Sequence, residues 1–460
     1  MSRLIIVSNR VAMVTEGKTA TGGLAIAVLA ALRETGGIWF GWSGELTSAQ
    51  DSRPKIFETG NLTYATVSLN ERDYEQYYNG FANSTLWPLF HYRLDQMAYN
   101  RSDLTGYLRV NGKFVGHLIP LLEPDDMVWV HDYHLIPIAE LLRGAGFEGR
   151  IGFFLHTPLP SYDLLISLPC HADIVRSLCA YDVVGFQTER DLHAFREYIE
   201  LQGGGSVASD GTVEAYGRRL KAAVYPIGID TENVARMAQA AMRSNSLLRL
   251  RRSIAERTLL IGVDRLDYSK GLIERFEAFE RLLRNYPQNR NRATFLQIAP
   301  PTRSDIPEYN EIRRKLEETS GHINGQYAEF DWSPIRYLNK GVQRRTLAGF
   351  FRLAQVGLVT PLRDGMNLVA KEYIAAQDPE DPGVLVLSRF AGAAQQLTEA
   401  LLVNPFDIDD MAQAMQIALD MLLDERKRRW RILMDNVTTH DISAWRKDYL
   451  ADLQGDAGAA

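Results

Sequence analysis

The stretch VDRLDYSKGL, residues 263–272, places two cations where an apolar run gives way to an amphipathic one. The apolar run 258–263 predicts a buried strand, and LIERFEAFERLL after it has the spacing of a helix. Arg265 and Lys270 thus precede a helix N-terminus, which already carries partial positive charge. An anion would balance both cations, and phosphate is a common ligand of such helix ends. The alternative is surface ion pairing with nearby carboxylates, which are Asp264, Asp267 and Glu274.

A second candidate site lies in RDGMNLVAKEYIAAQ, residues 363–377. Asp364 and Gly365 predict a turn, and the residues after them predict a helix. Amides at the start of that helix could bind a second anion or an oxyanion. Asp364 and Glu372 could accept hydrogen bonds from hydroxyl groups. By charge pattern alone, Lys371 beside Glu372 is typical of an ordinary solvated helix face.

In the N-terminal half, polar residues follow two apolar runs. In HDYH, residues 131–134, Asp132 is either an acceptor for a sugar hydroxyl or the N-cap of the helix after it. The histidines of that motif do not predict a metal site, because no cysteine pair or HExxH motif completes one. His156 ends the next apolar run and is either a core residue or a functional one.

Two further stretches have an ordinary structural explanation beside a functional one. The glycines Gly22 and Gly23 open a run of small residues with helical spacing, so they permit close approach to a ligand or form a plain turn. The aromatic-rich stretch 74–93 is a candidate platform for a sugar ring. Core packing is expected to account for most of its aromatic residues.

The elements that must position these residues are short, continuous apolar runs, which are typical of strands buried on both faces of a parallel sheet. They occupy residues 4–8, 127–131, 151–156, 182–187, 259–263, 293–299, 356–360 and 383–388. Helical patterns lie between them, so the predicted fold class is α/β with doubly wound layers. Ligands of such sheets bind beyond the carboxyl ends of the strands, where polar residues cluster in both halves of this chain.

The strand series is interrupted once, which predicts two domains. Residues 202–218 predict a surface loop or hairpin, VYPIGID (224–230) a strand, and the Arg-rich stretch 230–255 helices. We therefore expect one domain over residues 1–229, a second over 230–440, and a helix within 441–460 that packs back on the first domain before a flexible tail.

Composition excludes several classes of protein. The chain has 460 residues, 46% hydrophobic and 23% charged, with a formal net charge of −6, so no global positive field attracts nucleic acid or a membrane surface. Cys170 and Cys179 predict free thiols in a reducing compartment. The N-terminus lacks the pattern of a signal peptide, and no apolar stretch is long enough to span a bilayer. We expect a cytoplasmic protein.

Ten motifs together resemble one family, the trehalose-6-phosphate synthases, over residues 3 to about 450. They are SNR, GGLA, FGWSG, LWPLFHYR, HDYHL, GFFLHTPLP, GFQTE, YPIGI, DRLDYSKGL and TPLRDGMNLVAKEY. The resemblance implies a retaining glycosyltransferase of the GT-B class, with two Rossmann-like domains facing each other across a cleft. It implies transfer of glucose from UDP-glucose to glucose 6-phosphate, with no cofactor and no metal. A homodimer or homotetramer is expected.

The resemblance also implies a role for each candidate residue. The implied catalytic residues are His156, Arg265, Lys270 and Asp364. The implied donor-binding residues are Gly22, Gly23, Arg265, Lys270, Val342, Asp364, Gly365, Met366, Asn367, Leu368, Val369 and Glu372. The implied acceptor-binding residues are Arg10, Trp42, Tyr78, Trp87, Asp132 and Arg303. The N-terminal domain would then be the acceptor side, and the C-terminal domain would bind the nucleotide sugar. Val342 stands where close family members often have an aromatic residue near the nucleobase, so the nucleobase stays open.

Two other functions stay open at this point. A related transferase could use glycerol 3-phosphate or a cyclitol phosphate as its acceptor, and a GT-B shell could be a sugar-phosphate sensor without turnover. The presence of Arg265, Lys270, Asp364 and Glu372 favours an enzyme. No carboxylate is implied beneath the anomeric carbon, so the expected mechanism is front-face internal return, in which the leaving phosphate helps to deprotonate the acceptor.

Overall fold

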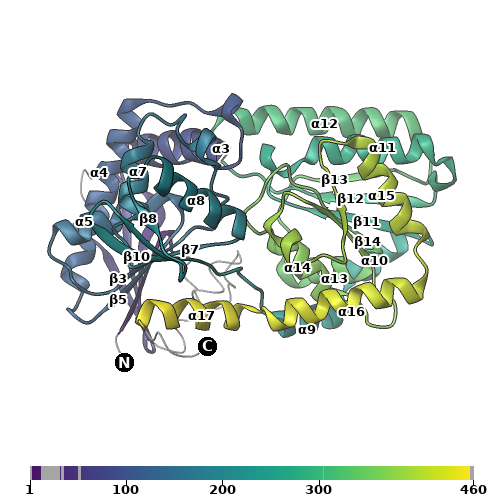
Figure 1. Ribbon diagram of the computed structural model, residues 1–460. Coiled ribbons are helices and arrows are strands. Elements are labelled where there is room, and N and C mark those ends of the chain that lie inside the picture. The colour runs from purple at the N-terminus through teal and green to yellow at the C-terminus, as the bar shows by residue number, and fades with distance from the viewer. Residues whose placement is uncertain are drawn as a thin grey trace. The chain divides into compact units, whose positions relative to one another are not determined.

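The chain divides into two compact units, shown as a computed structural model in Figure 1. The structure describes residues 3–11, 29, 32, 36–49, 53–303 and 305–455. Unit 1 comprises Met1–Pro226 and Ala444–Ala460, and unit 2 comprises Ile227–Ser443. The predicted boundaries, after residues 229 and 440, differ slightly from this division. The reason is packing, because the backbone N–H of Ile442 donates to the carbonyl of Ile229 and ties both crossing segments to unit 2.

Unit 1 contains a ten-stranded sheet in the order β3-β4-β2-β1-β5-β6-β7-β10-β9-β8. The strands from β4 to β10 in that order pair in parallel, and antiparallel pairs close both edges. The strands are β1 Leu4–Arg10, β2 Gly37–Leu46, β3 Lys55–Thr59, β4 Leu62–Leu69, β5 Met127–His131, β6 Ile151–Phe154, β7 Val183–Phe186, β8 Ser206–Val207, β9 Thr212–Ala215 and β10 Arg218–Val224.

The helices of unit 1 include one from the far end of the chain, α17, drawn in yellow in Figure 1. Among the described residues of unit 1, six other helical elements span only three or four residues. The helical elements are α2 Glu71–Asp73, the π-helix η1 Tyr74–Leu86, α3 Trp87–Phe90, η2 Leu94–Gln96, α4 Arg101–Leu118, η3 Ile119–Leu121, η4 Tyr133–Leu135, α5 Ile138–Gly144, α6 Tyr162–Leu165, α7 His171–Leu178, α8 Glu189–Leu201 and α17 Ile442–Gln454.

Unit 2 contains a six-stranded sheet in the order β13-β12-β11-β14-β15-β16, and every pair in it is parallel. The strands are β11 Thr258–Val263, β12 Ala293–Ile298, β13 Ile335–Leu338, β14 Val356–Val359, β15 Val384–Ser388 and β16 Leu401–Val403. The helical elements are α9 Thr231–Ala241, α10 Asn245–Ile254, η5 Tyr268–Lys270, α11 Leu272–Asn285, η6 Pro287–Asn289, α12 Pro307–Tyr327, α13 Arg344–Leu353, α14 Leu368–Ala376, η7 Gly392–Gln395, α15 Ile408–Asp420 and α16 Leu423–Thr439.

Every apolar run that the sequence predicts as a strand contains one, and the expected hairpin forms from β8, β9 and β10. The predicted strand VYPIGID is wrong beyond Val224, where β10 ends. Pro226 lies two residues further on, and a proline has no N–H to donate to a sheet. The sequence also missed β2 and β4, whose polar residues and glycines break the apolar pattern even though both strands are largely buried.

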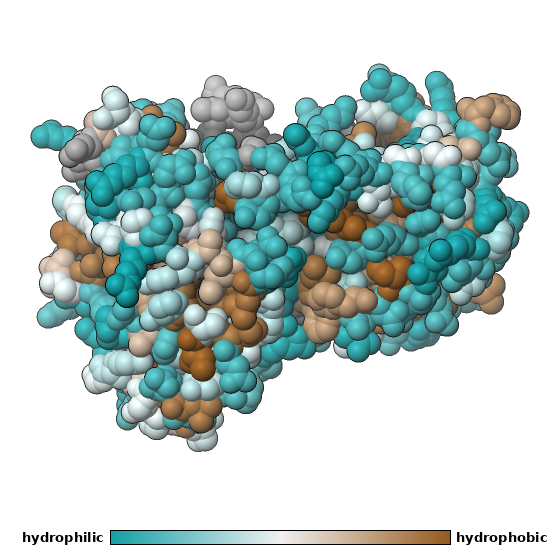
Figure 2. All heavy atoms as spheres, turned by 90° about the horizontal axis from the view of Figure 1, so that it is seen from above, coloured by the Kyte–Doolittle hydropathy of each residue, from teal (hydrophilic) through white to brown (hydrophobic). Residues whose placement is uncertain are grey.

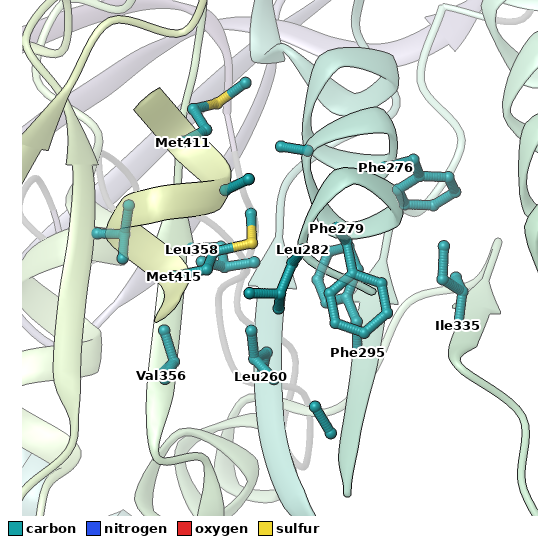
Figure 3. Close-up of a cluster of buried hydrophobic side chains, with 14 of the residues drawn as sticks. Leu260, Phe276, Phe279, Leu282, Phe295, Ile335, Val356, Leu358, Met411 and Met415 are labelled. Atoms are coloured by element: carbon teal, nitrogen blue, oxygen red, sulfur yellow. The ribbon is translucent and has the colours of Figure 1, made fainter. Parts of the chain in front are cut away.

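The core of unit 2 lies where α11 and α15 cover one face of its sheet (Figure 3). Phe276, Phe279 and Leu282 of α11 share one helical face because they recur at three-residue spacing. They pack with Leu260 of β11 and Phe295 of β12, and all five are fully buried. This packing anchors α11, and thereby holds the loop that precedes it against the sheet.

The surface is mostly polar on the face shown in Figure 2, with small apolar areas between. Within the described residues, we find no helix with the length and apolar character needed to cross a membrane.

Candidate active site

The loop between β11 and α11 carries the first candidate residues, and its own hydrogen bonds hold it. The carboxylate of Asp267 accepts from the N–H of Ser269 at 2.9 Å and from its hydroxyl at 2.8 Å, which caps η5. Gly271 has φ +62°, and a Cβ there would lie 2.3 Å from the carbonyl oxygen of Thr360. Only glycine therefore lets α11 start this close to the end of β14.

Two of the predicted residues meet at the end of this loop. The Lys270 ammonium donates to Asp364 Oδ2 at 2.6 Å, and the two side chains are only 8% and 15% exposed. Asn367 Nδ2 donates to the same carboxylate oxygen at 3.0 Å. Arg265, in contrast, is exposed on the same loop. The surface ion pairing that the sequence left open for Lys270 is thus a largely buried ion pair, with a residue far away in the sequence.

A buried cation that was not among the predicted site residues also stabilises this loop. Arg275 of α11 is fully buried, and its Nη1 donates to Asp264 Oδ2 at 2.6 Å and to Gln297 Oε1 at 2.9 Å. Its Nε donates to the Thr360 hydroxyl at 2.9 Å, and its Nη2 to the Lys270 carbonyl at 3.2 Å. Burial raises the pKa of Asp264, and Arg275 opposes that shift. The sequence feature that could have identified Arg275 is its position as a charged residue on the apolar face of the amphipathic helix α11.

The second predicted segment opens α14 as expected. Gly365 and Met366 are buried, and Asn367 adopts a left-handed conformation with φ +70° as the N-cap of α14. No side-chain hydrogen bond caps this helix, so its first amides at Leu368 and Val369, both half-buried, keep their capacity to bind an anion.

The residues further along α14 differ from the predicted solvated face. Lys371 is fully buried and its ammonium donates to the Ile227 carbonyl at 2.8 Å, so the sequence-based interpretation is wrong for it. Burial lowers the pKa of Lys371 to about 7. Glu372 is half-buried and pairs with Arg344 at 3.4 Å. Burial raises its pKa, and Arg344 counteracts this. The half-buried Val342 precedes α13, which carries Arg344.

Arg303, predicted as an acceptor ligand, joins the loop network of unit 2. Its Nη1 donates to the Tyr309 hydroxyl at 2.5 Å and lies 3.4 Å from Asp267 Oδ2, and its side chain is 4% exposed. Its φ is +48°, an uncommon backbone conformation for a residue other than glycine. Burial raises the pKa of Tyr309, while Arg303 and Arg265 oppose that rise. A phosphate bound by Arg303 would therefore share this guanidinium with Asp267 and Tyr309.

In unit 1 the structure brings Asp132 and His156 together at the ends of β5 and β6. Asp132 Oδ1 accepts from the backbone N–H of His156 at 3.3 Å. His131 Nδ1 lies 3.1 Å from His156 Nε2, so one ring donates and the other accepts. Burial lowers the pKa of His156 to about 3, and burial with the adjacent His156 lowers the pKa of His131 well below its usual range. Both rings are neutral near pH 7.

Asp132 does not act as a side-chain N-cap, which was the alternative interpretation. Its φ of 76° and ψ of 163° fall in a region that only glycine occupies readily. Strain of this kind costs about 1–3 kcal/mol, and it persists because the surrounding structure holds the residue in place. The strained backbone places a carboxylate beside His156.

We expect Asp132→Gly to be more stable than Asp132→Ala, because both lack the carboxylate that accepts from His156 and only glycine relieves the strain. Relief of the strain, about 1–3 kcal/mol, exceeds the entropic cost of about 0.5–1 kcal/mol, so Asp132→Gly should melt a few degrees above Asp132→Ala. Asp132→Asn keeps both the strain and an acceptor oxygen and is the control, with an unchanged melting temperature expected. Equal melting curves for Asp132→Gly and Asp132→Ala would contradict a strained Asp132.

Aromatic rings gather around the other acceptor candidates of unit 1. The half-buried Tyr78 of η1 stacks on Tyr74 at 5.4 Å and on His134 at 5.9 Å, and its ring lies 5.6 Å from that of Trp42. The guanidinium of the exposed Arg10 lies 5.8 Å from the Trp42 ring. The sequence predicted Trp42 and Tyr78, but not the part that Tyr74 and His134 take in this stack.

Trp87, also predicted as an acceptor ligand, is buried and packs at 4.0 Å from the His91 ring and 5.8 Å from the Tyr133 ring. Core packing thus accounts for much of its surface. Gly22 and Gly23 lie outside the described residues. Among the residues that are described, no three His, Cys, Asp or Glu side chains form a group that could hold a metal ion.

Comparison with known proteins connects this geometry to a family. The profile of glycosyltransferase family 20 matches residues 3–455. A trehalose-6-phosphate synthase of Sinorhizobium fredii is 53% identical over 456 residues, which cover 98% of each chain.

Two solved structures carry bound molecules. The UDP-forming alpha,alpha-trehalose-phosphate synthase of Burkholderia xenovorans, in complex with glucose-6-phosphate, is 54% identical with a TM-score of 0.95, over 98% of this chain and 100% of that one. An Escherichia coli structure with UDP-2-fluoro glucose bound is 47% identical with a TM-score of 0.94, over 98% and 99%. The predicted GT-B fold class is confirmed by these structures together with the two α/β units. The chain belongs to glycosyltransferase family 20.

Proposed function

We propose that this chain transfers glucose from UDP-glucose to glucose 6-phosphate, giving alpha,alpha-trehalose 6-phosphate and UDP with retention of configuration. The observation that carries the proposal is the Lys270–Asp364 pair, a cation and a hydroxyl acceptor 2.6 Å apart. Lys270 lies on the loop before α11, which Arg275 supports, and Asp364 lies in the segment before α14. The relatives, similar over nearly their whole length, support both substrates, since one binds glucose-6-phosphate and another UDP-2-fluoro glucose.

In the proposed reaction, the bond between the anomeric carbon and the diphosphate breaks while the acceptor oxygen attacks from the same face. Arg265 and Lys270 neutralise the charge that grows on the leaving diphosphate, and the amides at the start of α14 add to this. The diphosphate oxygen takes the proton of the acceptor hydroxyl. Asp364 accepts a hydrogen bond from a hydroxyl of the transferred glucose.

We propose that each of the remaining candidate residues binds either the donor or the acceptor. Gly22, Gly23, Val342, Gly365 to Val369 and Glu372 bind the donor, and His156 lies beside its glucose. Arg10 and Arg303 bind the phosphate of the acceptor, and Trp42, Tyr78, Trp87 and Asp132 order its sugar ring. A location in the cytoplasm and assembly into a homodimer or homotetramer are further proposals, which fractionation and light scattering test.

The activity is tested by incubating the protein with UDP-, GDP- and ADP-glucose and a panel of phosphorylated acceptors. Release of UDP together with an α,α-linked disaccharide phosphate, identified by NMR, is the expected result. A product with glycerol 3-phosphate or a cyclitol phosphate instead would show a related transferase. Binding of both substrates without any turnover would show a sensor.

The proposed reaction uses no metal, because Arg265 and Lys270 supply the positive charge that a divalent ion otherwise supplies to a leaving diphosphate. We therefore expect activity to persist after exhaustive dialysis against EDTA, within about twofold of the untreated protein. The measurement is UDP release before and after dialysis, with magnesium or manganese added back in parallel. Complete loss that either ion restores would contradict a metal-independent reaction.

A further inference from the structure

A residue near the C-terminal end of the chain packs against the His131–His156 pair. Trp445 of α17 is buried, and its ring centre lies 6.4 Å from that of His131 and 6.3 Å from that of His156. The same indole packs 5.0 Å from the Trp129 ring and edge-on to Phe154 at 5.1 Å. A residue some 290 positions from His156 thus covers one side of both imidazoles with an apolar ring.

The sheet of unit 1 makes specific packing contacts with this helix. Tyr449, one helical turn after Trp445, stacks on Trp129 at 4.5 Å and donates to the Phe153 carbonyl at 2.9 Å. A Cβ at Gly152 would lie 2.4 Å from the Tyr449 hydroxyl, and one at Gly185 would lie 2.8 Å from its ring. Both glycines leave room for Tyr449, which makes the position of α17 on β6 and β7 specific.

A second set of contacts fixes the C-terminal end of α17, which is the end farther along the chain from Trp445. Asp452 accepts from the Lys221 ammonium and from the Tyr225 hydroxyl, each at 2.5 Å. Arg150 Nε donates to the Leu453 carbonyl at 3.0 Å. These contacts explain how one helix, far along the chain, is placed accurately enough for Trp445 to reach the histidine pair.

We propose that Trp445 is a positioning residue for the reaction: it holds the hydrogen-bonded His131–His156 pair in place and shields it from water. The inference rests on the proposed function, in which His156 lies beside the reacting glucose. By this inference, α17 contributes a positioning residue to the active site of unit 1.

The shield matters because of the charge that develops on the transferred glucose. Glycosyl transfer passes through a transition state with oxocarbenium-ion character, which is positive. A neutral imidazole beside that charge is compatible with it, whereas an imidazolium repels it. Burial keeps the pKa of His156 at about 3, so the ring stays neutral over the physiological range. Removing the apolar wall admits water, and the pKa returns toward about 6.5.

The groups that face the pair do not supply a competing explanation. The carboxylate of Asp132 accepts from the His156 backbone, and a negative charge there would raise, not lower, the pKa of an imidazole. Two titratable groups of α17 lie next to Trp445 in the helix. The hydroxyl of Tyr449 donates to the Phe153 carbonyl, and Arg446 is the residue that follows Trp445 in the sequence. Burial is the first cause of the lowered pKa for both histidines.

The test compares kcat/KM from pH 5 to 9 in wild type, Trp445→Ala, Trp445→Leu and Trp445→Phe. Rates are taken relative to wild type at each pH, so that titration of the substrate phosphate cancels. We expect the relative rate of Trp445→Ala to fall about tenfold between pH 8 and pH 5.5, since a histidine of pKa about 6.5 is then about nine-tenths protonated. Trp445→Leu should show the same fall to a smaller extent, and Trp445→Phe should stay near wild type.

An NMR titration of the His156 ring gives a readout that needs no turnover. We expect its pKa to rise by at least one unit in Trp445→Ala or Trp445→Leu and to be unchanged in Trp445→Phe. Lys447→Gln, at an exposed position of the same helix, is the matched control and should leave both profile and pKa as in wild type. Folded alanine and leucine variants with the wild-type pH profile and histidine pKa would overturn the inference. Absence of transfer in wild type would refute the proposed function alone, since the titration still decides the role of Trp445.

Discussion

Replacement of Lys270 by alanine is expected to lower kcat by at least about a hundredfold, comparable to the loss of one preorganised donor to a developing negative charge. The leaving diphosphate must be stabilised as its bond to glucose breaks, and Lys270 is the buried cation of the loop that we assign to it. Its position is fixed on two sides, by Asp364 at the ammonium and by Arg275 at the carbonyl. The loss should appear in kcat, because the charge is greatest in the transition state.

Removing Lys270 also breaks an ion pair, so the effect on rate needs a matched control. Lys113 of α4 pairs with Asp73 at 2.6 Å, the same distance as Lys270 with Asp364, and we assign it no part in the reaction. Lys113→Ala should keep a kcat within about twofold of wild type, because surface and partly exposed ion pairs contribute little. Steady-state UDP release with melting curves of all three proteins is the measurement. Near-native turnover of Lys270→Ala would refute the assignment of Lys270.

The second large effect concerns the acceptor. Glucose without its phosphate should be transferred with a kcat/KM about ten-thousandfold below that of glucose 6-phosphate, as expected when a site built around a polar group meets an analogue that lacks it. Charge-assisted hydrogen bonds to a doubly charged phosphate are stronger than neutral ones. When glucose is bound, the buried guanidinium of Arg303 would lack the phosphate oxygens as acceptors, while its contacts with Asp267 and Tyr309 would remain.

Substitution of Arg303 separates phosphate recognition from general damage. Arg303→Ala should reduce the preference for glucose 6-phosphate over glucose at least about tenfold, whereas a purely structural role would lower both rates and leave their ratio unchanged. Tyr309→Phe removes the hydroxyl that Arg303 contacts at 2.5 Å and is the control for damage to the loop network. An unchanged ratio in Arg303→Ala would show that other residues bind the phosphate. A preference for glycerol 3-phosphate would refute the named acceptor and leave glucosyl transfer intact.

The local elements of both sheets were accessible from the sequence, because a buried parallel strand needs a continuous apolar run and leaves little room for other patterns. The loops that follow β5, β6, β11 and β14 were predicted for the same reason, since polar residues at strand ends cannot belong to the core. The strands β2 and β4 were missed because glycines, serines and threonines in them pack against neighbours rather than forming an apolar run. Side-chain periodicity alone does not report such packing.

The residue types needed for phosphate and hydroxyl binding, and the family, were determined by the sequence itself, since the chemistry of Arg265, Lys270, Asp364 and Glu372 resides in their side chains and the motifs that contain them are long. Their partners were decided only by the tertiary structure. Lys270 meets Asp364 and Trp445 meets His156 across long stretches of chain, and no local pattern encodes such distances. Burial likewise turned Lys371 from an expected surface lysine into a buried one with a lowered pKa. Hydration depends on every element packed around a group, so it is a property of the folded chain and not of a segment.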